Sequence, residues 1–589
     1  MSHHPTPEQS ALDAWLAAFA SALEREDRQA LASLFTEDAD WRDIVAFTWD
    51  FSTAVGPEAI ADRLLETNAE TRASQVLPDL TRTPTSRVRR AGEEVVEGFH
   101  TFETSVGHGT GIVRLREEPD GRMLAKTLLT TLQELEGFEE RRGARRPHGT
   151  AYSRTFGGQN WKDLREAERA YADRDPEVLV VGGGQAGLTI AARLRTIGVD
   201  ALVIDAHERV GDVWRKRYHS LTLHNEAWVA SLPYLEFPDT WPTYIPKDKL
   251  ADWFEFYAEA MELNTWTSTR LVSGRYDESA DQWTVELDRE GTTVTMQPRH
   301  VVMATGSVSG IPSMPKLPGL DEFAGEVMHS SRYSSGAEFR GRRALVIGTG
   351  TSGHDVAQDL HALGSEVSIV QRSSTTVVSL EPSGISVYAL FSQGLPLDDA
   401  DLIAAGNSFP TLIKANQLLA QQMLKDDAEL LERLHAVGFR TDIGEDHTGF
   451  HLKYNRRGGG YYINVGCSDL IADGEVGLIQ HDQIERFTAD GVRLRDGSVL
   501  PLDLVVMATG YGNQQEDVRR YFGDEVADAV GPIWGVDDGG EMRNMWRRTA
   551  QPGLWFHAGS LAACRANSKY LAVQIKAELE KIAPARRTA

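Results

Sequence analysis

The sequence predicts an α/β protein that has two doubly wound parallel sheets and a smaller α+β unit before them. Two glycine-rich segments, EVLVVGGGQAGLTIAARL and RALVIGTGTSGHDVAQDL, predict the two sheets. Each segment follows a short apolar run rich in Val and Ile and opens a stretch with helical spacing. This is the pattern of a strand, a tight turn and a helix. A length of 589 residues is enough for about three to five domains of ordinary size.

Composition and charge exclude several classes of partner. The chain carries 61 Lys and Arg against 86 Asp and Glu, a formal net charge of −25. Nucleic acid and anionic membrane surfaces need a basic footprint, so neither is expected as a partner. No run of about 18 apolar residues predicts a membrane span, and no secretion signal is recognised at the N-terminus. We therefore expect a cytoplasmic protein without a metal site.

The cysteines argue against a dithiol reductase. Cys467 and Cys564 are the only two, and they lie too far apart for a CxxC redox pair or a zinc knuckle. Two free thiols suit a reducing cytoplasm.

Residues 1–145 are the predicted α+β unit, because helical spacing comes first and strand patterns follow. The helices are expected at Ala11–Leu23, Asp27–Leu34 and Gly56–Leu65, and the strands at Val95–Phe102, Gly111–Leu115 and Leu124–Leu135. This order resembles the cone-shaped SnoaL-like, or ketosteroid-isomerase-like, fold. The resemblance implies a carboxylate inside the cone, Asp40 or Asp43. The alternative is a structural or dimerising domain in which Trp41 and Phe47 belong to the core.

The two glycine segments predict two bound dinucleotides. The first glycine of each motif allows the tight turn, the second lets the backbone approach a pyrophosphate, and the third lets the helix pack closely on the strand. The helix N-terminus offers unpaired N–H groups to the phosphates. The predicted contacts are Gly182, Gly184, Gln185, Ala186 and Gly187 in the first motif, and Gly348, Gly350 and Gly353 in the second. Two such Rossmann-like units suit a flavin enzyme that is reduced by a nicotinamide.

The strand that follows each motif indicates which dinucleotide it takes. Asp205 ends the strand LVIDA, where a carboxylate hydrogen-bonds ribose hydroxyls and repels a 2′-phosphate, so the first site suits FAD or NAD. Arg372 ends the strand in VSIVQRSS, where a guanidinium pairs with a 2′-phosphate, so the second site suits NADPH. The alternative for Arg372 is a solvated strand-end charge, and use of NADH stays open.

A motif between the two glycine segments carries a family resemblance. Phe323, Gly325, His329 and Tyr333, in FAGEVMHSSRY, resemble the identifying motif of flavin-containing monooxygenases. The sister Baeyer–Villiger group has the same motif but ends in Trp. The resemblance covers residue 176 to about residue 580. With the SnoaL-like unit in front, the chain is most similar to the type II flavin-containing monooxygenases. That group uses NADH or NADPH and performs both Baeyer–Villiger and heteroatom oxygenation.

The resemblance implies roles for individual residues around the flavin. His224 and Asn225, in LTLHN, resemble the family's Thr-Asn pair, whose Asn faces the flavin and helps to hold the oxygenated intermediate. His329 is implied to orient the linker strands and the NADP site. Arg457, or its neighbour Arg456, is implied to stabilise a peroxyflavin. The resemblance further places Val213, Trp214 and Arg215 along FAD, and Thr351, Ser352 and His354 along the nicotinamide nucleotide, with Arg372 at the 2′-phosphate.

These interpretations divide the chain into five segments. A linker at 146–175 precedes the first part of the FAD-binding domain at 176–340. The NADPH-binding domain with a helical insert is expected at 341–455, and the return of the FAD-binding domain at 456–589. The repeated ending VMATG, at Val302–Gly306 and Val506–Gly510, supports a return of the chain beside the dinucleotide.

The predicted function is an FAD-dependent, NAD(P)H-consuming monooxygenase with tightly bound FAD. It inserts one atom of O₂ into a small organic substrate through a C4a-(hydro)peroxyflavin, by Baeyer–Villiger oxidation of ketones or by N- or S-oxygenation. The alternative is an NADPH-dependent flavin reductase or dehydrogenase that inserts no oxygen. A binding protein with a degenerate flavin site is a further alternative, which the intact glycine motifs disfavour. A homodimer is expected.

Overall fold

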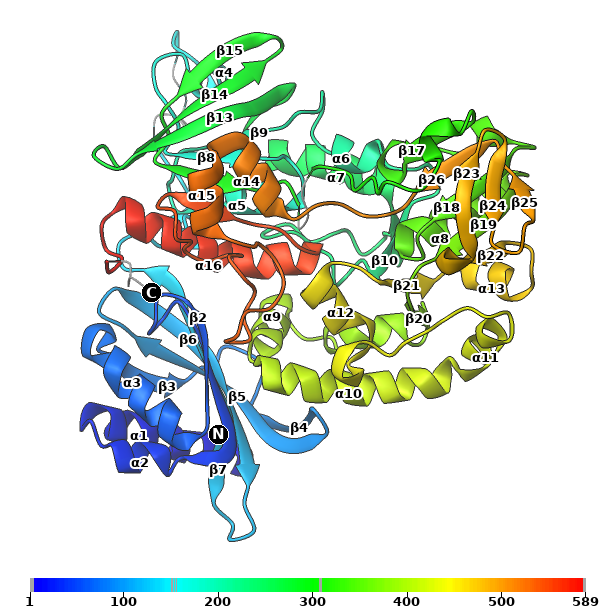
Figure 1. Ribbon diagram of the computed structural model, residues 1–589. Coiled ribbons are helices and arrows are strands. Elements are labelled where there is room, and N and C mark those ends of the chain that lie inside the picture. Colours follow the sequence, from blue (N-terminus) through cyan, green and yellow to red (C-terminus); the bar gives the residue numbers. More distant parts are fainter. Residues whose placement is uncertain (1–4, 150–151, 153, 155, 307–309, 586–589) are drawn as a thin grey trace.

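The computed structural model describes residues 5–149, 152, 154, 156–306 and 310–585 (Figure 1). Figure 1 shows three main parts: an N-terminal unit in blue, a first parallel sheet above it, and a second parallel sheet beside the first. Helices in yellow-green run between the N-terminal unit and the second sheet.

The N-terminal unit has three helices against one seven-stranded sheet. The helices are α1 (Pro7–Glu24), α2 (Arg28–Ala32) and α3 (Pro57–Thr71). The strands run in the order β2-β1-β7-β6-β5-β3, with β4 on β5. Their bounds are β1 (Phe35–Ile44), β2 (Phe51–Val55), β3 (Ser74–Pro78), β4 (Ser86–Arg90), β5 (Glu93–Glu103), β6 (Gly107–Glu117) and β7 (Met123–Leu135). Each helix and strand predicted in this unit is present, and Trp41 and Phe47 are buried in its core.

The first parallel sheet has the strand order β12-β9-β8-β16-β27. Its central strand β8 carries the first glycine motif, and α5 (Gln185–Thr196) follows the motif directly. The bounds are β8 (Val178–Val181), β9 (Ala201–Ile204), β12 (Asn264–Trp266), β16 (His300–Met303) and β27 (Leu554–Phe556). An antiparallel sheet of β13 (Thr269–Asp277), β14 (Gln282–Arg289) and β15 (Thr292–Met296) is inserted before β16.

The second parallel sheet repeats this arrangement in the order β22-β19-β18-β26-β17. The second glycine motif follows its central strand β18, and α8 (Thr351–Ala362) begins at the motif. The bounds are β17 (Glu326–His329), β18 (Arg343–Ile347), β19 (Glu366–Gln371), β22 (Gly477–Gln480) and β26 (Leu504–Met507). The antiparallel insertion is here β23 (Ile484–Thr488), β24 (Gly491–Leu494) and β25 (Val499–Pro501). The predicted α/β fold with two Rossmann-like units is therefore confirmed.

The predicted return of the chain at residue 456 is placed too early. β22 and β26 both lie in the second sheet, and the chain re-enters the first sheet only with β27. The ending VMATG occurs twice because β16 and β26 occupy equivalent places, each beside the strand that carries a glycine motif. The repeat therefore marks two copies of one fold.

The helical pattern at 400–439 is interrupted twice. It forms α9 (Leu397–Ala405), α10 (Phe409–Asp426) and α11 (Ala428–Ala436), and α12 (Gly449–Arg457) follows. Ser408 caps α10 by accepting a hydrogen bond from the N–H of Thr411, and Pro410 lies in the first turn, where no N–H is needed. A 3₁₀ segment, η6 (Gly384–Ser392), precedes α9.

The remaining elements connect these parts. They are α4 (Trp161–Ala170), α6 (Asp212–Arg215), β10 (Thr222–Glu226), β11 (Tyr244–Pro246), α7 (Lys247–Ala260), β20 (Thr376–Ser379), β21 (Tyr461–Asn464), α13 (Cys467–Ala472), α14 (Gln514–Phe522), α15 (Asp524–Val530) and α16 (Leu561–Leu579). Among the described residues, no helix has the length and apolar character that crossing a membrane requires. Nor does the described part of the chain bring together three potential metal ligands of the His, Cys, Asp or Glu type.

Candidate active site

The first glycine motif has the geometry that a bound dinucleotide needs. Gly182 has a φ of +111°, and a Cβ on Gly187 would lie 1.8 Å from the carbonyl oxygen of Gly182. Only glycine allows this turn and this contact between α5 and the strand. At Gly184, by contrast, an added Cβ would meet nothing nearer than Val213 at 3.6 Å, so this face of the loop is open. That open face is where a pyrophosphate approaches the backbone.

The second motif repeats these distances. Gly348 has a φ of +117°, and a Cβ on Gly353 would lie 1.9 Å from the carbonyl oxygen of Gly348. A Cβ on Gly350 would have its nearest neighbour, the carbonyl oxygen of Tyr461, at 4.0 Å. In both motifs, therefore, the first and third glycines are tightly packed against each other, and the middle glycine faces open space.

Asp205 lies directly after β9 and is held beneath the first loop. Its Oδ2 accepts a hydrogen bond of 2.7 Å from the N–H of Gly183, and its Oδ1 accepts one of 2.7 Å from the N–H of His207. Oδ1 also pairs with Nδ1 of His207 at 2.8 Å, whereas Oδ2 has lone-pair capacity left for a ribose hydroxyl. Nearby, the indole N–H of Trp214 is buried without an acceptor among the described residues. An open Gly184, a fixed Asp205 and an unpaired Trp214 donor fit a bound FAD.

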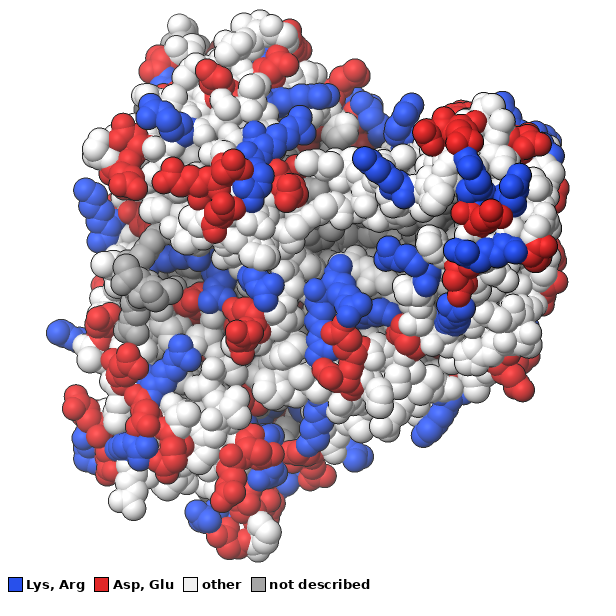
Figure 2. Space-filling model, viewed as in Figure 1, with Lys and Arg blue, Asp and Glu red and all other residues white. Residues whose placement is uncertain are grey.

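The two glycine motifs open into one cavity of about 290 Å³. The start of α5 and the start of α8 both line it, and so does the start of α16. Figure 2 shows a groove between the parts that contain the two sheets, with Lys and Arg side chains along its rim. The predicted site residues that line the cavity are Gln185, Trp214, His224, Asn225, Thr351 and Ser352.

Asn225 has a partner that the sequence did not indicate. It forms a hydrogen bond with the hydroxyl of Tyr388, which lies on η6, and burial raises the pKa of Tyr388. The Tyr388 ring lies 6.2 Å from that of His451 on α12, measured between ring centres. Burial lowers the pKa of His451 to about 4, so this imidazole is neutral at neutral pH. Asn225 therefore faces an aromatic wall supplied by the segments inserted in the second domain.

His329 hydrogen-bonds to a distant segment of the chain and is not among the residues that line the cavity. Its Nε2–H donates a hydrogen bond of 3.0 Å to the carbonyl oxygen of Gly510, and its Nδ1 accepts one of 3.1 Å from the N–H of Ser331. In the same motif, the hydroxyl of Tyr333 donates a 2.6 Å hydrogen bond to Asp359 on α8. Through His329, this motif is bonded to the segment after β26. Through Tyr333, it is bonded to α8, the helix of the second glycine motif.

Three predicted residues have other surroundings than expected. His354 is fully buried and stacks on Tyr462 with ring centres 3.9 Å apart, so the predicted contact with a nucleotide is corrected to a packing role. Arg457 ends α12, is mostly exposed and pairs with Glu445, outside the residues that line the cavity. Arg215 pairs with Asp212 on its own helix.

Arg372, the predicted ligand of the 2′-phosphate, has the backbone of Arg440 near it. Arg372 is exposed directly after β19. The preceding residue, Gln371, donates a 2.8 Å hydrogen bond to the carbonyl oxygen of Arg440 and accepts one of 2.8 Å from its N–H. These two bonds hold the backbone of Arg440 beside the end of β19. No local signal indicates this pairing, because the two segments are distant in the sequence.

Asp355 also lines the cavity and was not predicted. The hydroxyl of Tyr218, which precedes β10, donates a hydrogen bond to Asp355 on α8. This bond connects the first domain to the second across the cavity. Burial raises the pKa of Asp355 to about 6, against the opposing effect of the Tyr218 hydrogen bond.

Asp355→Asn is expected to flatten the pH dependence of stability between about pH 4 and pH 6. Because its folded-state pKa is raised, the folded protein binds this proton more tightly than the unfolded chain does. Stability then falls as pH rises through this window, and the Asn variant loses that part of the slope. Urea unfolding across the window measures the effect. The exposed Asp538→Asn is the control and should reproduce the parent slope, and an unchanged slope in Asp355→Asn would contradict the assignment.

Comparison with known proteins agrees with this geometry. A model of the flavin-binding monooxygenase-like family matches residues 175–516. The chain belongs to this family. The indole-3-pyruvate monooxygenase YUCCA1 of Oryza sativa subsp. japonica is 32% identical over 350 residues, which cover 59% of this chain and 80% of that protein. The probable indole-3-pyruvate monooxygenase YUCCA9 of Arabidopsis thaliana is 33% identical over 339 residues, covering 56% and 74%.

A solved structure supports the fold. The ε-caprolactone-bound crystal structure of cyclohexanone monooxygenase superposes with a TM-score of 0.50 at 19% identity, covering 69% of this chain and 88% of that one. The predicted activity and cofactors are confirmed at the level of the family: the protein is a flavin monooxygenase that uses FAD and NADPH. The N-terminal unit lies outside the residues that the family model matches.

Proposed function

We propose that the protein transfers one atom of O₂ to a small ketone, or to a soft nitrogen or sulfur compound, in the cavity between the two glycine motifs. The observation that carries this proposal is that both helix N-termini and Asn225 line one cavity. FAD would lie on the first motif and NADPH on the second. When bound, these cofactors supply the redox chemistry.

The chain's own residues would orient the reactants and exclude water. The Asn225 amide can donate hydrogen bonds, and its bond with Tyr388 restricts its orientation. Tyr388, His451 and Tyr461 form an aromatic wall near it, with ring centres of Tyr388 and His451 6.2 Å apart. A dry, pre-oriented donor stabilises developing negative charge better than water does.

Labelled O₂ tests this proposal. The holoenzyme with NADPH and ¹⁸O₂ should place one ¹⁸O atom in the product of a cyclic ketone or of an aryl methyl sulfide. Asn225→Ala should lower the fraction of NADPH oxidation that yields product and raise the fraction that yields H₂O₂. Asn567→Ala, on α16 with its amide bonded to its own helix, is the control. Absence of label from every product would favour the reductase alternative.

Arg372→Ala is expected to raise the KM for NADPH by about 10- to 100-fold and to leave the KM for NADH unchanged. A hydrogen bond to a charged group contributes about 1.5–3 kcal/mol, and only NADPH carries the 2′-phosphate. Steady-state kinetics with both coenzymes measure this difference. Arg493→Ala, an exposed arginine on β24, is the matched control. Equal changes for the two coenzymes would contradict the assignment of the 2′-phosphate to Arg372.

For the N-terminal unit we propose a SnoaL-like fold with a supporting role. Asp43 is buried and accepts hydrogen bonds from Thr130 Oγ1 at 2.6 Å and from the N–H of Thr48 at 2.8 Å. Asp40 accepts one of 2.9 Å from Thr411 on α10. Both oxygens of Asp43 are thus engaged in structural hydrogen bonds, which favours the structural interpretation for this residue, whereas Oδ1 of Asp40 is buried without a partner among the described residues.

This unit holds both ends of α9, through the segment between β3 and β4 at one end and through β6 at the other. Asp399, in the first turn, accepts hydrogen bonds from Arg82 at 2.6 Å and from the N–H of Thr83 at 2.8 Å. Arg114 on β6 donates to the carbonyl oxygen of Ile403 at 2.8 Å, near the end of the helix. On another side, Asp401 of α9 pairs with Arg565 of α16 at 2.7 Å. We infer that the unit supports the inserted segments that carry Tyr388.

A homodimer and a cytoplasmic location stay predictions. Light scattering of the purified holoenzyme should give twice the chain mass of 65.1 kDa if the dimer forms. A mass of one chain would contradict it.

A further inference from the structure

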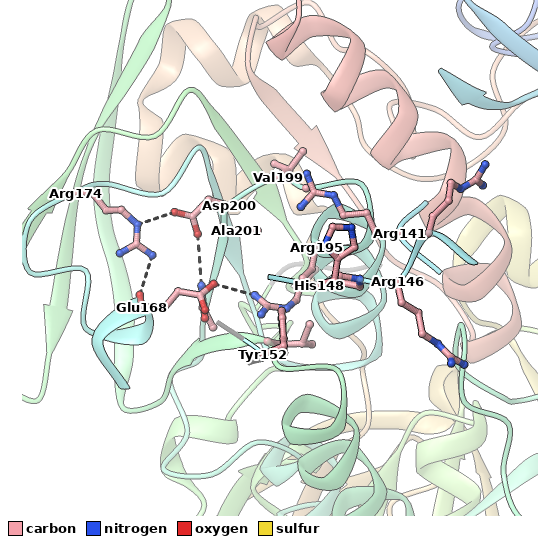
Figure 3. Close-up of a pocket in the computed structure, with 16 residues that line it drawn as sticks. Arg141, Arg146, His148, Tyr152, Glu168, Arg174, Arg195, Val199, Asp200 and Ala201 are labelled. Carbon is pink, nitrogen blue, oxygen red and sulfur yellow. Dashed lines mark hydrogen bonds and ion pairs between the residues drawn. The ribbon is translucent and has the colours of Figure 1, made fainter. Parts of the chain in front are cut away.

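A second cavity, of about 630 Å³, lies away from the nucleotide cleft. It is found at the amino ends of β9 and β12, near Asp200 and Asn264, whereas the cleft lies at the carboxyl end of β9. Figure 3 shows Arg195 and Arg141 near its centre, Arg174 turned toward Asp200 and Glu168 on one side, and the Arg146 side chain extending outward on the other. We call it the arginine basin, defined by Arg141, Arg145, Arg146, Arg174 and Arg195.

Two of these arginines are held in place by the protein itself. Arg174 donates from Nε to Asp200 at 3.0 Å and from one terminal nitrogen to the carbonyl oxygen of Glu168 at 2.9 Å. Arg195 donates to the carboxylates of Glu168 and Glu262, both at 2.9 Å. A guanidinium has five N–H donors, so each group keeps donors beyond these bonds. The inner wall of the basin therefore presents fixed positive groups.

Of the linker arginines, Arg145 pairs with Glu134 at 3.2 Å, whereas Arg141 and Arg146 have no such partner among the described residues. The backbone N–H of Arg141 donates a 2.8 Å hydrogen bond to the carbonyl oxygen of Thr196, which brings the linker to the end of α5. The Arg141 guanidinium lies over Gly198, where an added Cβ would come within 2.6 Å of it. Among the described residues, neither Arg141 nor Arg146 has a carboxylate within ion-pair distance or a side-chain hydrogen bond.

The balance of charge in the basin is opposite to that of the chain. Five arginines line it against two carboxylates, Glu168 and Asp200, in a protein whose net charge is −25. Arg145 and Arg195 also pair with Glu134 and Glu262, so the excess positive charge rests on Arg141 and Arg146, which a bound anion would neutralise. Phosphate matches their planar, bidentate donor geometry. A cavity of this size lies within the usual range of small-molecule sites, about 300–1,000 Å³.

We propose that the arginine basin binds a small phosphate-bearing anion, at a site separate from the FAD and NADPH cleft. Arg141 and Arg146 would supply the attraction, and Arg174 and Arg195 the fixed donors. The inference does not depend on the proposed substrate, because the basin shares no lining residue with the cleft.

Inorganic pyrophosphate is the probe, titrated calorimetrically into the FAD-loaded holoenzyme. The double variant Arg141→Ala/Arg146→Ala should lose at least about tenfold in affinity for one binding component. Arg493→Ala should retain that component. Pyrophosphate bound in the nucleotide cleft contributes equally to all three proteins and so cancels from the comparison. Superimposable isotherms for the parent and the double variant, or a parent that binds no pyrophosphate outside the cleft, would overturn the proposal.

Discussion

Gly187→Ala should yield a protein that is purified without flavin and that unfolds at a lower temperature than the parent. The added Cβ would lie 1.8 Å from the carbonyl oxygen of Gly182 and 3.4 Å from a methyl group of Val180. Backbone cannot yield to such a contact as a flexible side chain can, so α5 must move away from β8. The turn that receives the pyrophosphate would then open, and FAD binding would be lost. Flavin absorbance per protein and thermal unfolding measure the two effects.

Gly184→Ala separates cofactor binding from folding. Its added Cβ has only Val213 nearby, at 3.6 Å, so the apoprotein should keep the parent's stability. The same methyl group would occupy the open face of the loop and should lower FAD affinity. Gly459→Ala, where a Cβ meets nothing within 4 Å, is the control for both properties. Full flavin content in Gly184→Ala would contradict the assignment of FAD to the first motif.

The sequence predicted best those features that depend on neighbouring residues. A strand, three glycines and a helix are contiguous, so both Rossmann-like units could be predicted with their central glycines. Helical periodicity also predicted the three helices of the N-terminal unit, and strand patterns predicted β5, β6 and β7. Helical periodicity could also have excluded the predicted contact of His354 with the nucleotide. Thr351, Ser352 and Asp355 share one face of α8, whereas His354 points to the core. Consecutive residues of a helix do not all face the same ligand.

The missed features depend on contacts between distant segments. Tyr218 reaches Asp355 and Tyr388 reaches Asn225 only after the domains pack together, and Gln371 fixes Arg440 only after the segment that follows α11 packs against β19. The exposed position of Arg457 is likewise set by where α12 ends and by Glu445. A single sequence has no local pattern for such pairs. The docking of the N-terminal sheet against α9 belongs to the same class, since it joins β6 to the helical insert.

Arg114→Ala should lower the free energy of unfolding by about 3 kcal/mol at neutral pH and raise the share of NADPH oxidation that yields no oxygenated product. Breaking a buried ion pair costs about 3–5 kcal/mol because the remaining charge stays buried. Arg114 is 1% exposed and its Nε lies 2.8 Å from Glu97, which keeps Arg90 as a second partner at 2.6 Å. This remaining partner places the expected cost at the lower end of the range.

The pH dependence of this variant distinguishes the ion pair from simple packing. Burial acts to raise the pKa of Glu97, but Arg114 and Arg90 hold it below its ordinary value. That pair stabilises the fold above the unfolded pKa of Glu97 and is lost as pH falls through the folded pKa. The difference in stability between parent and Arg114→Ala should therefore shrink toward acidic pH. A loss of packing alone would leave a constant difference.

Arg116→Ala is the matched control on the same strand. Its ion pairs with Glu118 and Asp38 are partly exposed, and such pairs contribute about 0–1 kcal/mol. Arg114 also donates to Asn407 at 2.6 Å and to Ile403 at the end of α9. Loss of these bonds frees the helix that packs beside η6 and Tyr388, so only Arg114→Ala should increase H₂O₂ formation. Normal coupling in a destabilised Arg114→Ala would mean that the N-terminal unit contributes stability without influencing the position of Asn225.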